Sequence, residues 1–208
     1  VELDVKLTKD QIPIIFHDES LGRTTGVEGL VRDLTLAEIK ELDAGSWFGE
    51  SFIGTKIPTL EEAVDAILER DLGFNLEIKP CPGREKETAE AILDTLSNIW
   101  DDEDKLLISS FQHVSLESAL DMTPNWHRGL ILPEDWPENW EDLCDYLKVA
   151  TVNINGNTCT RDQVESIIDK DLMVLAYTIN EPDRARFLQA WGVDGYFSDT
   201  PDILEDIF

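Results

Sequence analysis

The sequence predicts an α/β fold, because short apolar segments with strand character alternate with amphipathic helical segments along its 208 residues. The expected strands are 1–6, 74–79, 105–110, 128–132, 149–154, 172–177 and 194–198. The expected helices are 60–70, 85–100, 114–122, 139–147, 161–169 and 182–191, with a short final helix at 201–208. Strands that alternate with helices in this way are typical of a parallel sheet.

One further strand, 12–17, follows the first after only a few residues. A parallel crossover needs a dozen or more residues, so this strand is expected to form a hairpin. The seven remaining βα units fall one short of a TIM (β/α)8 barrel, which has about 250 residues. We therefore predict a TIM barrel whose first βα unit is missing from the printed sequence. An open doubly wound sheet is the alternative, but no glycine-rich phosphate loop follows any expected strand.

We expect one domain over 1–208, with a small hairpin and loop insertion at about 12–58. Within the insertion, 34–42 has a helical pattern that Asp33 or Thr35 could cap. A long loop segment in a compact domain usually carries function or covers a site.

The charge balance excludes one class of partner. Acidic residues number 44 and basic residues 17, which gives a formal net charge of −27. A protein that binds nucleic acid needs a basic surface to displace counterions, so this class is excluded.

No apolar run approaches the length of a membrane span, and no secretory leader is visible. Three cysteines without metal-ligand spacing suit a reducing compartment. We expect a cytoplasmic protein without stable membrane association.

Two carboxylates share one face of the first expected strand. Glu2 and Asp4 are two positions apart, and Glu77 ends the next barrel strand, with Lys79 two positions further on. Barrel enzymes place catalytic groups at strand carboxyl ends. Converging carboxylates form an oxygen-rich site suited to Mg²⁺ or Ca²⁺. The alternative is that these residues are solvated charges at strand ends.

A histidine stands where the hairpin strand meets the long loop. His17 has a side chain whose ordinary pKa suits acid–base chemistry near neutral pH. A lone histidine is often structural, but its position near the expected mouth of the barrel favours a catalytic role.

Several short sequence blocks are spread over nearly the whole chain: ELDVKLTKD (2–10), HD (17–18), LGRTT (21–25), LDAGSWF (42–48), IPTLEE (57–62), LEIKP (76–80), SSF (109–111), YTIN (177–180) and GVDG (192–195). In their identity and order, these blocks resemble the glycerophosphodiester phosphodiesterase family. The chain looks most similar to the compact bacterial cytosolic branch.

The resemblance implies a metal-dependent TIM-barrel hydrolase in glycerophospholipid breakdown. Members convert glycerophosphodiesters to sn-glycerol 3-phosphate and an alcohol, with one divalent cation, Mg²⁺ or Ca²⁺. By position, the implied residues are the metal ligands Glu2, Asp4 and Glu77, the catalytic residues His17 and Lys79, and the substrate-binding residues Lys79, Phe111 and Tyr177. Tryptophan is common in the family at the place of Tyr177.

The family's first strand carries a His-Arg-Gly motif, and the following turn carries a Pro-Glu-Asn motif. The resemblance places both before Val1, where they would supply a second catalytic histidine, an arginine and a carboxylate. Two alternatives follow. One is a related TIM-barrel phosphodiesterase of the phospholipase type. The other, if the polypeptide truly begins at Val1, is a non-catalytic barrel that binds phosphodiesters.

Overall fold

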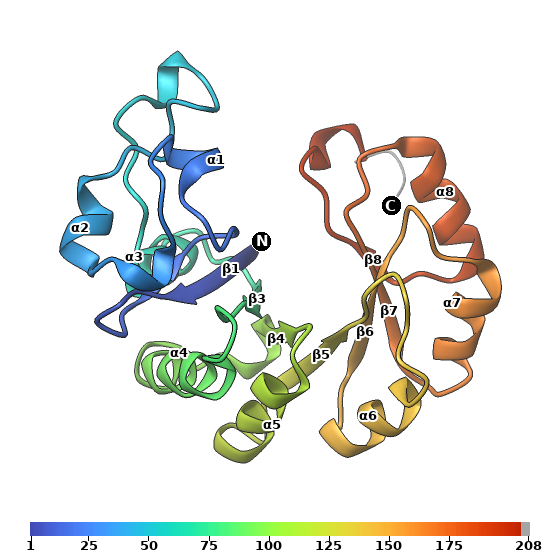
Figure 1. The fold of residues 1–208 in the computed structure, drawn as a ribbon. Helices are drawn as coiled ribbons and strands as arrows, with labels where there is room; N and C mark the ends of the chain where they lie inside the picture. Colours follow the sequence, from blue (N-terminus) through green and yellow to red (C-terminus); the bar gives the residue numbers. More distant parts are fainter. Residues whose placement is uncertain (205–208) are drawn as a thin grey trace. The chain divides into compact units, whose positions relative to one another are not determined.

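The computed structural model describes residues 1–204, and its contacts divide the chain into two compact units (Figure 1). The first unit contains Val1–Ile108 and Val114–Trp126, and the second contains Ser109–His113 and the described residues from His127 to Leu204. Of the helix expected at 201–208, the structure shows a 3₁₀ turn, η4(Pro201–Ile203), while 205–208 lie outside the described residues. Within the described part, no helix combines the length and apolar character needed to cross a membrane.

Parallel strands with one antiparallel addition form the sheet of the first unit. Its strand order is β2-β1-β3-β4, and the last two residues of β4 belong to the second unit. The strands are β1(Glu2–Leu7), β2(Pro13–Ile15), β3(Phe74–Ile78) and β4(Leu106–Ser110). β1 pairs with β3 in parallel, and β2 pairs with β1 antiparallel. The predicted hairpin is therefore confirmed.

Capping boxes begin two helices of this unit. The helices are α1(Gly22–Thr25), α2(Leu36–Glu41), α3(Leu60–Leu68), α4(Glu85–Ile99) and α5(His113–Met122), with 3₁₀ turns η1(Val31–Asp33), η2(Glu50–Phe52) and η3(Glu103–Lys105). Thr35 rather than Asp33 caps α2, because its side chain accepts a hydrogen bond from the amide of Glu38. Thr59 caps α3 in the same way.

The insertion is held by its own hydrophobic cluster, which consists of Ile14, Phe16, Leu21, Val31, Ile39 and Ile57. The 43–55 loop within it is closed at its neck by Asp43. This carboxylate accepts hydrogen bonds from the amides of Gly45 (2.8 Å), Ser46 (3.0 Å) and Gly54 (2.8 Å). The loop is therefore fixed in shape by polar contacts, although it exposes large apolar side chains, including Trp47.

The second unit repeats a strand-and-helix alternation. Its strands β5(His127–Ile131), β6(Thr151–Asn155), β7(Met173–Tyr177) and β8(Gly195–Tyr196) are adjacent and parallel in this order. The helices between them are α6(Trp140–Leu147), α7(Arg161–Ile168) and α8(Pro182–Trp191). Gly192, with φ of 100°, ends α8 in a left-handed conformation that favours glycine. The predicted α/β class is confirmed in both units.

Candidate active site

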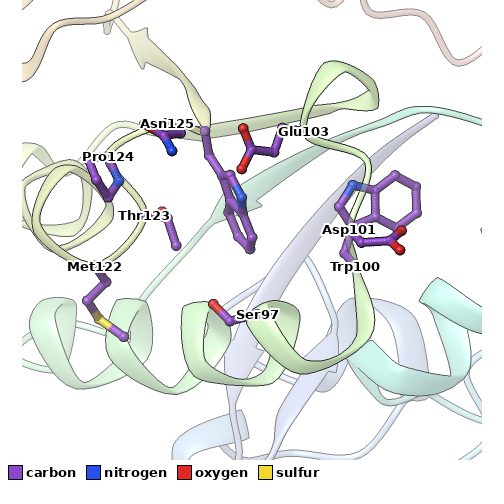
Figure 2. Close-up of a pocket in the computed structure, with 9 residues that line it drawn as sticks. Ser97, Trp100, Asp101, Glu103, Met122, Thr123, Pro124 and Asn125 are labelled. Atoms are coloured by element: carbon purple, nitrogen blue, oxygen red, sulfur yellow. The ribbon is translucent and has the colours of Figure 1, made fainter.

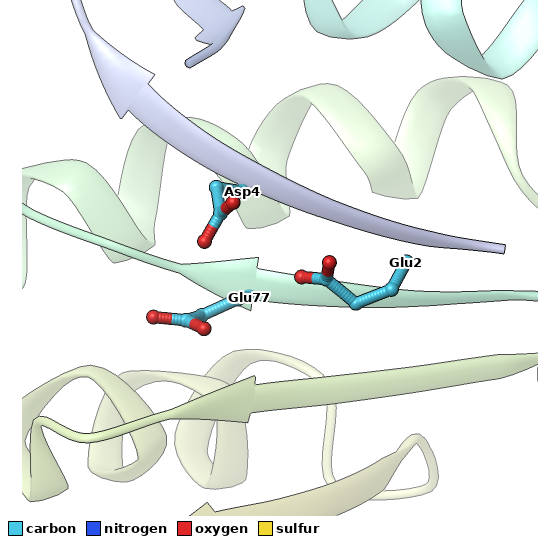
Figure 3. Close-up of side chains that lie close together, drawn as sticks. All are labelled: Glu2, Asp4 and Glu77. Carbon is cyan, nitrogen blue, oxygen red and sulfur yellow. The ribbon is translucent and has the colours of Figure 1, made fainter. Parts of the chain in front are cut away.

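Strands β1 and β3 bring three carboxylates together (Figure 3). The parallel register places Asp4 directly opposite Glu77, while Glu2 lies two residues before Asp4 on the same strand face. One oxygen from each of the three carboxylates lies within 4.8 Å of the others. The residues that spacing alone put forward as a cation site are therefore neighbours in space.

Lys79 extends this cluster beyond the end of β3. Its Nζ donates a hydrogen bond to Oδ1 of Asp4 at 2.9 Å and lies 3.3 Å from Oε1 of Glu77. Burial lowers the pKa of Lys79, but the carboxylates of Glu77 and Asp4 outweigh this effect and raise it. The buried Lys6 supports the segment, because its Nζ donates to the carbonyl oxygen of Lys79 at 3.0 Å. The sequence analysis did not identify Lys6. A lysine near the end of an otherwise apolar strand looks like an exposed surface residue in the sequence.

The electrostatics of the cluster fit a divalent cation. Loss of hydration, followed by the charges of Asp4 and Glu77, raises the pKa of Glu2 to about 8. Burial also raises the pKa of Glu77, against the opposing effect of Lys79. Oε1 of Glu77 is buried and accepts no hydrogen bond from the residues that the structure describes. One lysine thus leaves the three carboxylates under-neutralised, and carboxylate oxygens are the ligands that Mg²⁺ and Ca²⁺ prefer.

His17 lies just beyond β2, and its side chain contacts that of the next residue, Asp18. Its Nδ1 is 2.6 Å from Oδ1 of Asp18. Arg23 donates two hydrogen bonds to the same carboxylate, from Nε to Oδ2 at 2.6 Å and from Nη2 to Oδ1 at 3.0 Å. These hydrogen bonds from Arg23 are the main reason that the pKa of Asp18 falls to about 2. The guanidinium of Arg23 lies 5.3 Å from the ring centroid of Trp47.

A cavity of about 360 Å³ joins these groups within the first unit. Its walls include Glu2 and Asp4 on one strand, His17 and Arg23 on the following segment, and Trp47 from the 43–55 loop. Two carboxylates of the cluster, those of Glu2 and Asp4, therefore border the same space as the histidine. The roles of Asp18, Arg23 and Trp47 were not recognised from the sequence, since a loop contact has no periodic signal.

The predicted substrate-binding aromatics form a separate pair in the second unit. The rings of Phe111 and Tyr177 meet edge to face, with centroids 5.9 Å apart. The hydroxyl of Tyr177 donates a hydrogen bond to the carbonyl oxygen of Leu132 at 2.7 Å. This contact fixes the ring of Tyr177 at the end of β7.

A second cavity of the first unit, about 410 Å³, is lined by Ser97, Trp100, Asp101, Glu103, Met122, Thr123, Pro124, Asn125 and Trp126 (Figure 2). Both tryptophans are at most 7% exposed. Trp100 packs edge to face on Phe74, at a centroid distance of 4.8 Å, and donates from Nε1 to the carbonyl oxygen of Asp102 at 2.7 Å. The indoles are thus part of the core, and the predicted site residues are not among this lining.

The letters of the two motifs expected before Val1 do occur in the second unit, in a different structural setting. His127, Arg128 and Gly129 begin β5, where His127 is exposed and Arg128 is buried. Arg128 donates from Nε to the carbonyl oxygen of Leu147 at 2.9 Å, at the end of α6. Residues 137–139 read Pro-Glu-Asn, but they enter α6, where Trp136 and Trp140 pack edge to face. These segments therefore contact the two ends of α6, Arg128 at Leu147 and the tryptophan pair at Trp140.

Comparison with known proteins gives a consistent result. The model of the glycerophosphoryl diester phosphodiesterase family matches residues 1–203. A glycerophosphodiester phosphodiesterase from Caldanaerobacter subterraneus subsp. tengcongensis is 36% identical over 98% of this chain and 83% of its own length. One from Bacillus subtilis is 32% identical over 100% of this chain and 75% of its own length.

A solved structure extends the agreement to three dimensions. A phosphodiesterase from Oleispira antarctica, in complex with the product sn-glycerol-3-phosphate, matches with a TM-score of 0.94 and 40% identity. The match covers 99% of this chain and 83% of that one. The predicted TIM-barrel fold class and the sequence resemblance are both confirmed, and the chain belongs to the glycerophosphoryl diester phosphodiesterase family.

Proposed function

We propose that this chain hydrolyses glycerophosphodiesters to sn-glycerol 3-phosphate and an alcohol, as a cytoplasmic step of glycerophospholipid breakdown. Membership of the family supports the reaction, and the related Oleispira enzyme was solved with this product. The observation that carries the proposal is the cluster in which Lys79 lies against the carboxylates of Asp4 and Glu77. Such a site offers negative ligands for a cation and a positive group for a phosphate.

A divalent cation, Mg²⁺ or Ca²⁺, is the proposed cofactor, with Glu2, Asp4 and Glu77 as its protein ligands. When bound, it supplies positive charge that polarises a phosphoryl group. The under-neutralised carboxylates support this assignment, as does the buried Oε1 of Glu77, which accepts no hydrogen bond within the described residues although Lys79 lies 3.3 Å away.

Two side chains of the chain itself act on the substrate in this proposal. Lys79 offsets the negative charge that develops on the phosphoryl oxygens, which is worth most in a site of low dielectric constant. His17 donates a proton to the departing alkoxide, since an unprotonated alkoxide is a poor leaving group. Both residues belong to the first unit, where His17 lines the cavity beside the carboxylates.

Phe111 and Tyr177 are proposed to contact the glycerol side of the substrate. The edge-to-face pair offers an apolar surface for the carbon atoms of glycerol. The hydrogen bond of Tyr177 to Leu132 keeps its ring in one orientation.

The experiment that tests the proposal uses the whole gene product after removal of metal with a chelator. Release of sn-glycerol 3-phosphate is measured from a panel of glycerophosphodiesters, with Mg²⁺ or Ca²⁺ restored. We expect release only when a cation is returned. Glu61→Gln, on the exposed face of α3, is the matched control and should retain full turnover. Failure to release this product from every member of the panel would refute the proposal.

A further inference from the structure

We propose that Asp18 and Arg23 are positioning residues that hold His17 in one tautomer, so that its Nε2 is the nitrogen that exchanges a proton with the substrate. The tautomer follows from contacts in the structure. Its use during turnover rests on the function proposed above, in which His17 is the proton donor.

The first step concerns the charge on Asp18. Both of its oxygens accept hydrogen bonds from Arg23, at 2.6 Å and 3.0 Å, which is the two-point pairing of an ionised carboxylate with a guanidinium. An ionised carboxylate can only accept hydrogen bonds. Because Nδ1 of His17 lies 2.6 Å from Oδ1 of Asp18, Nδ1 must carry a hydrogen. A neutral imidazole has one N–H, so its Nε2 is the unprotonated nitrogen.

The second step concerns what holds Arg23. Its guanidinium lies over the ring of Trp47, at 5.3 Å from the centroid, which is within the range of a cation–π contact. Trp47 in turn donates from Nε1 to the carbonyl oxygen of Ala44 at 2.9 Å. The neck of this loop is closed by the hydrogen bonds of Asp43. A continuous set of contacts therefore leads from the 43–55 loop to the imidazole.

The third step explains why His17 needs such support. Its side chain is 59% exposed, so packing alone does not fix the ring. A carboxylate that accepts from Nδ1 fixes both the orientation of an imidazole and the nitrogen that reacts, and it stabilises the imidazolium. In a serine-protease triad, removing this carboxylate charge lowers kcat by about 10⁴ through the wrong tautomer. An exposed pair should lose less, and we expect a decrease of about 10².

The direct test is ¹⁵N NMR of the imidazole rings in the whole gene product, compared with the variants Asp18→Asn and Arg23→Gln. The 208 residues contain three histidines, and His113 and His127 act as internal references. We expect the signals of His17 to show hydrogen on Nδ1 and a bare Nε2 at alkaline pH. Asp18→Asn should mix or reverse the two tautomers, because an amide can donate to Nδ1. Unchanged tautomer populations in both variants would overturn the proposal.

Kinetics on two substrates supply the second readout. Asp18→Asn should lower kcat about 10²-fold on a glycerophosphodiester with an alkoxide leaving group, but only a few fold on a p-nitrophenyl ester, with KM little changed. Equal losses on both substrates contradict a positioning role. Arg23→Lys should recover part of the rate that Arg23→Gln loses, since lysine restores one charged hydrogen-bond donor to Asp18.

Two controls separate the causes of failure. Arg161→Gln removes an exposed arginine that pairs with Glu165 in α7, and it should change neither readout. Circular dichroism establishes whether each variant is folded. If Asp18→Asn does not fold, Arg23→Gln still tests whether the Asp18–Arg23 pair positions His17. If the wild-type protein shows no turnover at all, the proposed function fails, while the NMR experiment still decides the tautomer.

Discussion

The Nζ of Lys79 lies 2.9 Å from Oδ1 of Asp4 and so brings a positive charge of the protein itself into the carboxylate cluster. The same nitrogen is 3.3 Å from Oε1 of Glu77. Under the proposed function, Lys79 therefore has two effects of opposite sign on binding at this site. It would compete with a cation for the carboxylates, and it would attract the anionic substrate towards them, in a protein whose net charge of −27 repels anions.

Replacement of Lys79 by Gln should separate these effects. We expect the affinity for Mg²⁺ or Ca²⁺ to rise several fold, because a competing charge is lost. Turnover of glycerophosphodiesters should fall about 10²- to 10³-fold, since a group that stabilises the transition state is removed. Calorimetric titration measures the first effect and steady-state kinetics the second. Lys86→Gln, at an exposed lysine of α4, is the control. A parallel fall in cation affinity and activity would show that Lys79 instead builds the cation site.

Replacement of Glu77 by Gln should remove the increase in thermal stability that a bound cation gives. A ligand that binds the folded state at about 100 times its Kd adds about 2.7 kcal/mol, which for a chain of this size raises Tm by roughly 5–10 °C. We expect this rise in the wild-type protein and its loss in Glu77→Gln.

Without a cation, the Tm of Glu77→Gln at pH 7 should equal or exceed that of the wild type, because a buried carboxyl group that is repelled by Asp4 becomes neutral. Thermal melts with and without chelator measure both effects, and Glu61→Gln should behave as wild type. A cation-dependent rise that persists in Glu77→Gln contradicts the assignment of Glu77 as a ligand.

The cluster was predictable because regular geometry determines it. Residues two apart on a strand share a face, so Glu2 and Asp4 had to be neighbours. Parallel strands that follow one another in an α/β fold usually pair, which brings Glu77 to the same edge. The helix N-caps at Thr35 and Thr59 likewise follow from residues three positions apart in the sequence.

The support of His17 was not predictable by the same means. Asp18, Arg23 and Trp47 meet through an irregular loop, and no period in the sequence places them together. The letters His-Arg-Gly at His127 show the converse, because a short motif has meaning only in its structural setting. In this chain it begins β5, with Arg128 turned to the end of α6.

The ion pair of Asp18 predicts a dependence of stability on pH. The pKa of this carboxyl is about 2 in the folded protein and 3.8 in its unperturbed state. A lowered folded-state pKa contributes stability that is fully present above about pH 4 and is lost as the pH falls through 4 towards 2. Solvent screening limits this contribution to about 1 kcal/mol.

The free energy of unfolding of the wild type should therefore exceed that of Asp18→Asn by about 1 kcal/mol at pH 6, and the difference should shrink at pH 3. Urea unfolding at several pH values measures it. A difference that stays constant down to pH 3 shows that the loss in Asp18→Asn has another origin than the charge of the carboxylate.

The shape of the 43–55 loop depends on the absence of a side chain at Gly45. A Cβ atom there would lie 1.9 Å from the carbonyl oxygen of Phe52 and 2.7 Å from Oγ1 of Thr55, distances at which the backbone must move. Gly45→Ala should therefore reshape the loop, withdraw Trp47 from Arg23, and lower the free energy of unfolding by about 1–3 kcal/mol. Turnover should fall with it, because the arginine that holds Asp18 loses its aromatic support.

Gly49→Ala is a matched control in the same loop, since its φ of 167° is open to any residue and a Cβ there meets only Cδ2 of Phe52 at 3.8 Å. Urea unfolding and steady-state kinetics of the two variants measure the difference, and equal behaviour of both contradicts a role for the close contact at Gly45.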